Sequence, residues 1–233
     1  PQGVAYDITT NQLVLCPQSH NKVYLLNADT LALEETLTIS GESHHSTGVA
    51  VDADNYYFTD YTRNNGYMHK CPKSGKSGSS ISCTPMEQIA GYGGVPITIT
   101  GSTLYRAARD SSGSGSSSYD WSNLNSLVKS SVSNAKNGVQ GSCNLPAGGT
   151  DGLAYVGDNK ILRMKWNGDG GGSQPELSLI NADTCAVESS ITLNDACTGG
   201  QNAAGVAYKT GEVFIYCWGG SSSNVVVYNV NLA

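Results

Sequence analysis

Short apolar segments alternate with turn residues along the whole chain. At the beginning of the chain the segments are Gly3–Asp7, Gln12–Cys16, Lys22–Asn27 and Ala32–Ile39. They are rich in Val, Ile, Leu, Thr and Tyr, and turn-forming residues separate them, which is the pattern of short antiparallel β-strands. Charged residues make up only 14% of the chain, and residues that favour helices are scarce. The pattern therefore predicts an all-β protein rather than a helical bundle.

One phrase recurs five times. Each copy begins with Gly and an aliphatic residue, forms an apolar strand, turns, and continues into a second β-rich strand. The copies are GVAYDITTNQLVLC from Gly3, GVAVDADNYYFTDY from Gly48, GVPITITGSTLYRA from Gly94, GLAYVGDNKILRM from Gly152 and GVAYKTGEVFIYC from Gly205. A second phrase supports the first, because LLNADTLALEETLTI from Leu25 matches LINADTCAVESSITL from Leu179. The starts are roughly 45 to 58 residues apart, which is the spacing of four-stranded propeller blades.

The repeat defines the expected architecture. A lone four-stranded blade cannot bury both of its faces, whereas five blades packed around one axis cover each other. We therefore predict a single five-bladed β-propeller over residues 1–233, built from four-stranded antiparallel blades. The blades are expected to start near Gly3, Gly48, Gly94, Gly152 and Gly205.

The five phrases resemble the blades of β-propellers of the NHL and YVTN type. GVAVDADNYYFTDY is similar to the opening of an NHL repeat, and VYLLNADTLALEETLTI is similar to the YVTN pattern. The resemblance covers nearly the whole chain, and the third unit departs most, because a Ser-rich stretch from Arg109 to Trp121, expected to be a mobile loop, interrupts it. The resemblance implies the fold and leaves the function open, since such blades occur in lectins, enzymes, receptors and scaffolds.

The last unit shows signals for three strands only. Its second strand is expected at Glu212–Trp218 and its third at Asn224–Leu232, with no signal for a fourth. The third strand is apolar, uncharged and free of Pro, so its outer edge is a template for another strand. The predicted assembly edge consists of Val225, Val226, Val227, Tyr228 and Val230. A capping loop or a boundary of the chain at this point is the alternative, and whether the chain continues beyond either end is left open.

Long loops are expected on one face of the propeller, where the second and third strands of a blade are joined and one blade leads to the next. Binding sites normally occupy such loops. Aromatic rings beside polar donors suit sugars, because the ring face stacks and the donors bind hydroxyls. The candidate ligand-binding residues are Tyr61, Arg63, Arg109, Trp121, Trp166 and Trp218. Packing of these aromatic side chains between blades is the alternative.

Three histidines, His20, His44 and His45, are expected on the same face. They could form a metal or acid–base group, but no Glu or Cys stands near them at the spacing of a metal site. We therefore predict no metal and no cofactor. A fourth histidine, His69, is expected to be a packing or surface residue of a third strand.

Catalytic signatures are missing from the sequence. Ser74–Ser77 (SGKS) lacks the earlier Gly of a phosphate loop and is expected to be a solvated hairpin tip. Val51–Asn55 (VDADN) lacks the Gly and Glu of a calcium loop and is expected to be a plain turn. A glycoside hydrolase would need paired carboxylates in the central channel. Asp7 and Asp52 are the only pair expected near it, while Gly, Val, Ala and Leu line the channel itself.

Seven cysteines without a zinc-type spacing favour a secreted, partly disulfide-bonded protein. Cys71 and Cys83 are expected to pair across a hairpin, and Cys197 and Cys217 are expected to pair in the last blade. The unassigned cysteines are Cys16, Cys143 and Cys185. The odd total leaves at least one thiol free or bonded to another chain.

The net charge is −6, no basic block is present, and no apolar stretch approaches the length of a membrane helix. These features argue against nucleic-acid binding and membrane insertion. We predict a secreted, extracellular, non-enzymatic interaction or scaffold protein that joins other protein chains, chiefly its own copies in a filament, through the open edge. The alternatives are a glycan-binding lectin that uses the long-loop face and, third, a glycoside hydrolase.

Overall fold

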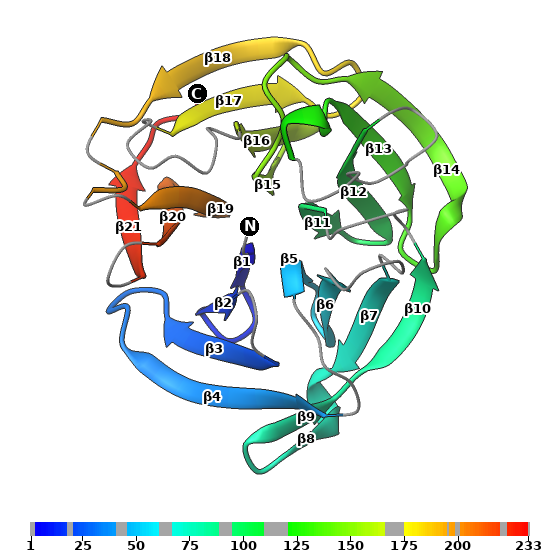
Figure 1. Ribbon diagram of the computed structural model, residues 1–233, viewed down its shortest axis with the longest axis vertical. Helices are drawn as coiled ribbons and strands as arrows, with labels where there is room; N and C mark the ends of the chain where they lie inside the picture. The colour runs from blue at the N-terminus through cyan, green and yellow to red at the C-terminus, as the bar shows by residue number, and fades with distance from the viewer. Residues whose placement is uncertain are drawn as a thin grey trace.

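A computed structural model describes residues 3–17, 21–40, 46–60, 67–88, 95–109, 121–165, 175–194, 196–198, 201–219 and 223–232. Five β-sheets stand around a central axis like the blades of a propeller (Figure 1). The first strand of each sheet lies next to the axis, and the later strands follow outwards. The predicted five-bladed, all-β fold is therefore confirmed. The described part of the chain contains no helix long and apolar enough to cross a membrane.

The strands are numbered in chain order. The first blade consists of β1 (Gly3–Asp7), β2 (Gln12–Cys16), β3 (Lys22–Asn27) and β4 (Leu33–Ser40). The second consists of β5 (Ser46–Val51), β6 (Asn55–Asp60), β7 (Tyr67–Pro72) and β10 (Thr84–Gln88). The third consists of β11 (Ile97–Thr100), β12 (Thr103–Ala108), β13 (Ser126–Ser131) and β14 (Asn134–Asn144). The fourth consists of β15 (Gly152–Gly157), β16 (Lys160–Met164), β17 (Glu176–Asn181) and β18 (Val187–Thr192).

The fifth blade has three strands in the described part of the chain, as the sequence predicted. They are β19 (Asn202–Lys209), β20 (Glu212–Trp218) and β21 (Asn224–Asn229). The last strand ends at Asn229 rather than at the predicted Leu232. One further backbone hydrogen bond, from the N–H of Val230 to the carbonyl of Gly211, follows the last pair of the ladder with β20.

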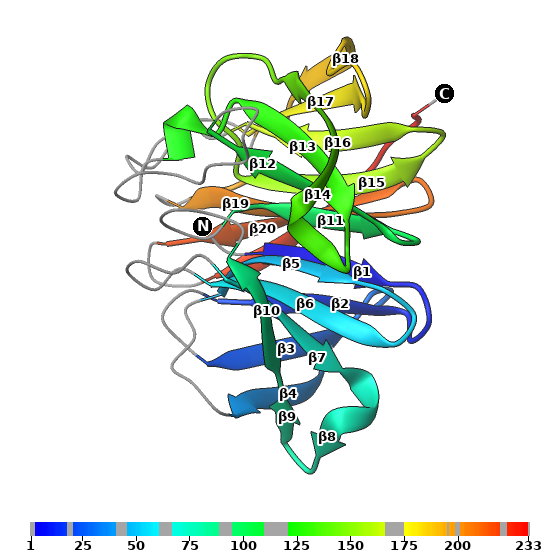
Figure 2. The same ribbon diagram turned by 90° about the vertical axis from the view of Figure 1, so that its right-hand side faces the viewer.

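The two faces of the ring differ in their connections. The turns between the first and second strands of the blades project from one face, called the turn face below, which is on the right in Figure 2. Asn11, Asp158 and Asn159 adopt positive φ in these turns, a conformation that Asn and Asp tolerate better than most residues. On the opposite face lies the connection from the third blade to the fourth, between Asn144 and Gly152.

Ser74–Ser77 is not the solvated tip that the sequence predicted. The segment begins in a 3₁₀ turn, η1 (Lys73–Gly75), and continues into β8 (Lys76–Ser77) and β9 (Ser80–Ser82). This hairpin leaves the second blade and adds β9 in parallel to β4, the outer strand of the first blade (Figure 1). Lys76 forms an ion pair with Glu35 at 2.7 Å. Ser74 and Ser77 are exposed as predicted, but the tip of the hairpin lies at Gly78 and Ser79. Turn residues alone do not reveal that β9 pairs with a strand about forty residues away.

The glycine that opens the repeat has a steric role at the axis. A Cβ atom on Gly3 would lie 2.5 Å from the backbone nitrogen of Val49, and one on Gly152 would lie 2.8 Å from that of Val206. The inner strands of neighbouring blades therefore approach each other too closely for a side chain at this position. The recurrence of Gly along the sequence follows from the crowding of five inner strands around one axis.

The third blade departs from the register that the repeat predicted. Its inner strand begins at Ile97, and Pro96 takes the place that Gly3 and Gly152 hold beside the narrow end of the channel. The carbonyl of Pro96 accepts a hydrogen bond from the N–H of Ala107, which fixes this register. Gly94 lies outside the described residues, and the place that matches Gly3 is held by Pro96, two residues further along the chain. Matching GVP to GVA shifted the third blade by two residues.

Apolar side chains fill the spaces between neighbouring blades. Three disulfide bonds add covalent links to this packing. Both predicted pairs, Cys71–Cys83 and Cys197–Cys217, are present. The third bond joins Cys143 on β14 to Cys185 in the turn after β17, and it links the third blade to the fourth. The sequence did not reveal this pair, because the two cysteines belong to different repeat units.

Packing closes the ring between the last blade and the first. Phe214 and Tyr216 of β20 are buried against Leu13 and Leu15 of β2. On the turn face Lys209 forms an ion pair with Asp29 of the first blade, and its ammonium lies 5.9 Å from the ring centre of Tyr6. In the described part of the chain no strand is shared between these two blades. Burial of side chains, rather than a common sheet, therefore holds the first and last blades together.

Cys16 is the single cysteine outside the disulfide bonds, and we expect it to be unreactive in the folded protein. Its thiol is buried at the end of β2, and burial raises its pKa to about 12, so the reactive thiolate does not form at neutral pH. Ellman's reagent should modify no cysteine in the native protein and one per chain after unfolding without reductant. Rapid modification of the native protein would contradict this prediction.

Candidate functional site

The outer edge of β21 is the most unusual surface in the described part of the chain. β21 pairs with β20 on its inner side, and no described strand pairs with its outer side. Its sequence, Asn-Val-Val-Val-Tyr-Asn, has no charge and no Pro. An exposed strand edge of this kind presents backbone N–H and C=O groups that another strand can bind.

The matching strands of other blades show how much of β21 is uncovered. Val227 of β21, Leu25 of β3 and Leu179 of β17 hold the same place in the strand pairing of their blades. Leu25 is 0% exposed and Leu179 is 4% exposed in blades that have a fourth strand, whereas Val227 is 37% exposed in the blade without a described one. The difference locates an open position at the outer edge of the fifth blade.

The neighbouring fourth blade is uncovered at the same place. Every residue of β18 is exposed, and Ile191 has 55% of its surface in contact with solvent. Leu37 holds the matching position on β4 and is 0% exposed, because the second blade covers it with its outer strands and the β8–β9 hairpin. Val227 and Ile191 are thus two apolar side chains that one further strand would cover.

The predicted assembly edge can now be placed residue by residue. Val226, Tyr228 and Val230 pack against the cluster between the fourth and fifth blades. Val225 packs against the cluster between the fifth blade and the first. These side chains are partly buried, so the sheet faces of β21 are anchored within the propeller, while no described strand pairs with its outer backbone edge.

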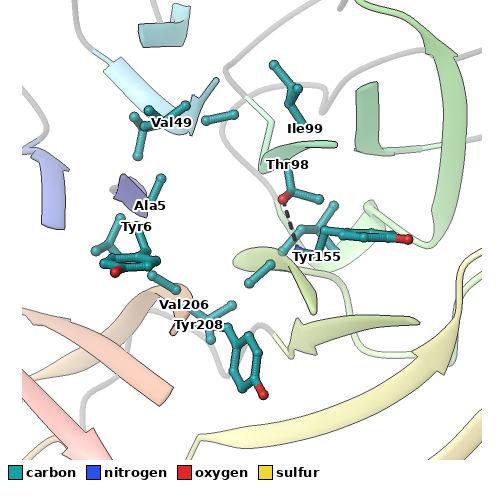
Figure 3. A pocket seen from close by; sticks show the side chains of 14 residues that line it. Ala5, Tyr6, Val49, Thr98, Ile99, Tyr155, Val206 and Tyr208 are labelled. Carbon is teal, nitrogen blue, oxygen red and sulfur yellow. Dashed lines mark hydrogen bonds between the residues drawn. The ribbon is translucent and has the colours of Figure 1, made fainter. Parts of the chain in front are cut away.

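The central channel is narrow and is lined mainly by residues of apolar type, although most of the surface exposed in it is polar. Each inner strand contributes two or three consecutive residues to a cavity of about 80 Å³, among them Tyr6, Tyr155 and Tyr208 (Figure 3). The tyrosine hydroxyls are engaged in the adjoining turns: that of Tyr6 donates to Asn11, and those of Tyr155 and Tyr208 accept from backbone N–H groups. Thr98 adds one polar atom, which accepts a hydrogen bond from the N–H of Tyr155 at 3.0 Å. The cavity therefore has room for a few waters rather than for a sugar.

Asp7 and Asp52 do not line this cavity. Asp7 is buried and forms an ion pair with Lys73 at 2.7 Å. Asp52 accepts hydrogen bonds from Tyr57 and from the backbone of Asp54 and Asn55, as a turn residue does. Burial acts to raise both pKa values, but these donors outweigh it and hold the pKa of each carboxyl below its ordinary value. A glycosidase needs one carboxyl that keeps its proton, and neither of these is such a group.

We expect the Asp7→Asn substitution to weaken the attachment of the β8–β9 hairpin to the first blade. It should lower the free energy of unfolding at neutral pH by roughly 1–3 kcal/mol, the cost of leaving a partly buried Lys73 without its partner. Because the pKa of Asp7 is depressed, its contribution is present above the unfolded value near 3.8 and is lost as the pH falls through the folded value. Urea titrations of both proteins between pH 7 and pH 2.5 test this, with Asp54→Asn as an exposed control. A difference between Asp7→Asn and the unmodified protein that does not shrink with acid would contradict it.

The candidate ligand-binding residues are only partly described. Tyr61, Arg63 and Trp166 lie outside the described residues, as do His20, His44 and His45 and most of the Ser-rich stretch. Arg109 follows the end of β12 and is exposed, and the backbone of Trp121 lies in a 3₁₀ turn, η2 (Trp121–Asn123). Trp218 ends β20 and is partly exposed. The ligand-binding role of all six residues stays a prediction. His69 is a buried residue of β7.

Two buried arginines escaped the sequence analysis. Arg106 and Arg163 hold the same position in β12 and β16, where the other blades have Leu15, Phe58 and Ile215. Arg163 donates to the carbonyl of Gly149 and to Thr150, and burial lowers its pKa to about 10. Arg106 donates to Ser130 and to the carbonyl of Ala135. Both side chains bind backbone within or beside their own blade, so the geometry assigns them a structural role.

A second hollow lies on the outer side of the ring, between the third and fourth blades. It has a volume of about 340 Å³ and is lined by Lys129, Gln140, Asp183 and small residues. Lys129 and Asp183 form an ion pair at 3.0 Å across it. No aromatic side chain lines this hollow, so it lacks the flat apolar surface on which a sugar ring stacks.

No family model matches the sequence, and a comparison with curated proteins gives no match. Solved structures match the fold. Glutaminyl cyclase of Myxococcus xanthus aligns with a TM-score of 0.65 at 12% identity, over 99% of this chain and 91% of the enzyme. A chain of the nidogen–laminin complex aligns with a TM-score of 0.58 at 14% identity, over 98% of this chain and 75% of that one. Hydrazine synthase of Kuenenia stuttgartiensis aligns with a TM-score of 0.53 at 13% identity, over 98% of this chain and 62% of that one.

These similarities establish the propeller fold and nothing finer. They include enzymes and a complex between two proteins, so the fold does not decide the function. The match to NHL and YVTN blades that the sequence suggested has no family model behind it. The propeller fold and its three disulfide bonds are typical of an extracellular protein.

Proposed function

We propose that this protein is an extracellular, non-enzymatic interaction module that binds a strand of another protein chain at the outer edge of β21. The observation that carries the proposal is the exposure of Val227, which lies at a strand position that is buried in the first and fourth blades. Strand addition to an exposed edge is a recurring mode of recognition, in which backbone hydrogen bonds supply affinity and alternate side chains supply specificity. We also propose that the repeat units are related to the blades of NHL and YVTN propellers.

If the bound strand comes from a second copy of this protein, the symmetry of the contact can be stated. Pairing of β21 with β21 of a second copy would be antiparallel and two-fold, and such a contact closes as a dimer. A filament requires a different segment of the neighbouring copy in the edge, because only a head-to-tail contact can propagate. The filament predicted from the sequence therefore depends on a strand that is not β21 itself.

The test uses two matched substitutions of exposed valines. Val227→Lys places a charge on the open strand of the fifth blade, and Val139→Lys places the same charge on β14, the outer strand of a complete blade. We expect Val227→Lys to abolish association of the protein, measured by light scattering and by electron microscopy of native material, and Val139→Lys to leave it unchanged. A uniform monomer at high concentration that also captures no strand would contradict the proposal.

The lectin and hydrolase alternatives have separate readouts. Binding on a glycan array would favour the lectin, and silence across sugars would remove it. Hydrolase activity that is lost on Asp7→Asn or Asp52→Asn would favour the enzyme, although the depressed pKa values of both carboxyls argue against it.

A further inference from the structure

The repeat of this chain also indicates which strand the open edge accepts. Resting on the proposed function, we propose that the occupant is an extended segment antiparallel to β21 with the pattern apolar–basic–any–Thr/Ser–apolar–Thr–apolar. This pattern is that of the fourth strands of the first and fourth blades with one change, a basic residue in place of Glu at the second position.

The register follows from the matching ends of three third strands. The third strands β3, β17 and β21 end at Asn27, Asn181 and Asn229. After each Asn, the next backbone N–H donates to a carbonyl in the turn between the first two strands of the same blade: Ala28 to Asn11, Ala182 to Asn159, and Val230 to Gly211. β21 therefore shares this hydrogen bond, and its register with the second strand, with the two third strands that are followed by a fourth strand. The pairing seen in those two blades can be transferred to it residue by residue.

The fourth strands of the first and fourth blades agree in detail. Leu33–Ile39 has the sequence LEETLTI, and residues 187–193 have the sequence VESSITL. Leu37 lies opposite Val23 and Ile191 lies opposite Leu177, and both strands bulge after their first residue. By this register the central apolar residue of the occupant lies opposite Val225, and its first residue lies opposite Tyr228. The alternation of apolar residues with Thr or Ser matches the two faces of the gap.

The second position of the occupant is expected to be basic, whereas the matching residues Glu34 and Glu188 are acidic, because the fifth blade carries a negative charge at Glu212. Glu34 of the first blade accepts hydrogen bonds from Gln12 at 2.6 Å and from Asn27 at 2.9 Å. Glu188 of the fourth blade forms an ion pair with Lys160 at 3.1 Å. Gln12 and Lys160 both stand at the beginning of a second strand, where the fifth blade has Glu212.

A Glu at the second position of the occupant would face the carboxylate of Glu212, whereas Lys or Arg would form an ion pair with it. The only cation near Glu212 among the described residues is Lys209, at 3.7 Å, and Lys209 is also bound to Asp29 of the first blade. Like charges across a strand pair destabilise it and opposite charges stabilise it. The open blade therefore favours a basic variant over a copy of the fourth strand of the first or fourth blade.

The first experiment compares two synthetic peptides, LEETLTI and LKETLTI, on the intact protein. We expect LKETLTI to bind about three- to tenfold more tightly in low salt, by fluorescence anisotropy, and the ratio to shrink as salt is added. In the variant Glu212→Lys the preference should reverse. A third peptide, LKETDTD, keeps the basic residue and loses two apolar ones, and it should not bind. Equal binding of the first two peptides, or a preference that Glu212→Lys does not change, would overturn the charge selection.

A second experiment removes the dependence on peptide affinity. Extending the protein after Ala233 by the sequence ALKETLTIS reproduces the turn length of the first blade and raises the local concentration of the strand. Hydrogen exchange at the amides of β21 should slow at least tenfold, and exchange at β14 should not change. The slowing at β21 should be smaller when the extension is ALEETLTIS. Unchanged exchange at β21 in the extended protein would overturn the inference. Loss of native association in Val227→Lys without any response to these strands would overturn the inference and leave the proposed function standing.

Discussion

The Phe214→Ala substitution is expected to lower the free energy of unfolding by about 3–5 kcal/mol, the usual cost of removing a buried aromatic ring. Phe214 is fully buried on β20 and packs between the fifth blade and the first. No described strand is shared across that junction, so its stability comes from buried side chains and from the Lys209–Asp29 ion pair. Removal of the ring leaves a cavity where the propeller closes.

The matched control is Phe58→Ala. Phe58 is buried between the first and second blades, which are also joined by the β4–β9 pairing and by the Lys73–Asp7 ion pair. Both substitutions should destabilise the protein to a similar extent in urea unfolding. Only Phe214→Ala should accelerate hydrogen exchange in β20 and β21 under native conditions, because only that junction can open locally. Equal local exchange in the two variants would show that the ring is not weakest at the last blade.

The strand order of the propeller could be predicted because the steric demand is the same in every blade. Gly at the axis, an apolar inner strand and an Asn- or Asp-rich turn recur wherever five inner strands crowd together, and the strands of the first blade lie within one residue of their predicted bounds. The third blade is an exception, since Pro96 holds the place beside the channel that Gly holds in the other blades, and no local signal distinguishes it from Gly94. A periodic pattern therefore shows that a repeat exists, but it does not fix the residue-by-residue alignment of a copy that differs from the others.

The contacts that the sequence did not reveal all join residues far apart along the chain. The β8–β9 hairpin pairs with a strand of another blade, and Cys143 bonds to Cys185 across two units. Arg106 stands in a strand of otherwise apolar character, and nothing local shows that its guanidinium reaches the carbonyl of Ala135. The open edge was predictable, because a missing strand signal is local. Its charge selectivity was not, because Glu212 matters only once the pairing of three blades is known.

The second large effect is expected at the axis. Gly48→Ala should lower the free energy of unfolding by about 3 kcal/mol, at the upper end of the usual range for overpacking. A Cβ atom on Gly48 would overlap the carbonyl oxygen of Val95 in the next blade and would lie 2.7 Å from Oγ1 of Thr59. That hydroxyl accepts from the N–H of Gly48 at 2.8 Å and donates to the same carbonyl at 2.9 Å. The added methyl group therefore separates two blades and breaks the bridge between them.

Gly141→Ala is the control for this prediction, because a Cβ atom on Gly141 in β14 meets no other atom within 4 Å. Thermal and urea unfolding should show Gly141→Ala within about 0.5 kcal/mol of the unmodified protein. If Gly48→Ala were equally harmless, the inner strands could move apart without cost, and crowding at the axis could not be the reason that the repeat begins with Gly. If both substitutions were harmful, the effect would belong to glycine in strands generally rather than to the contact between Gly48 and Val95.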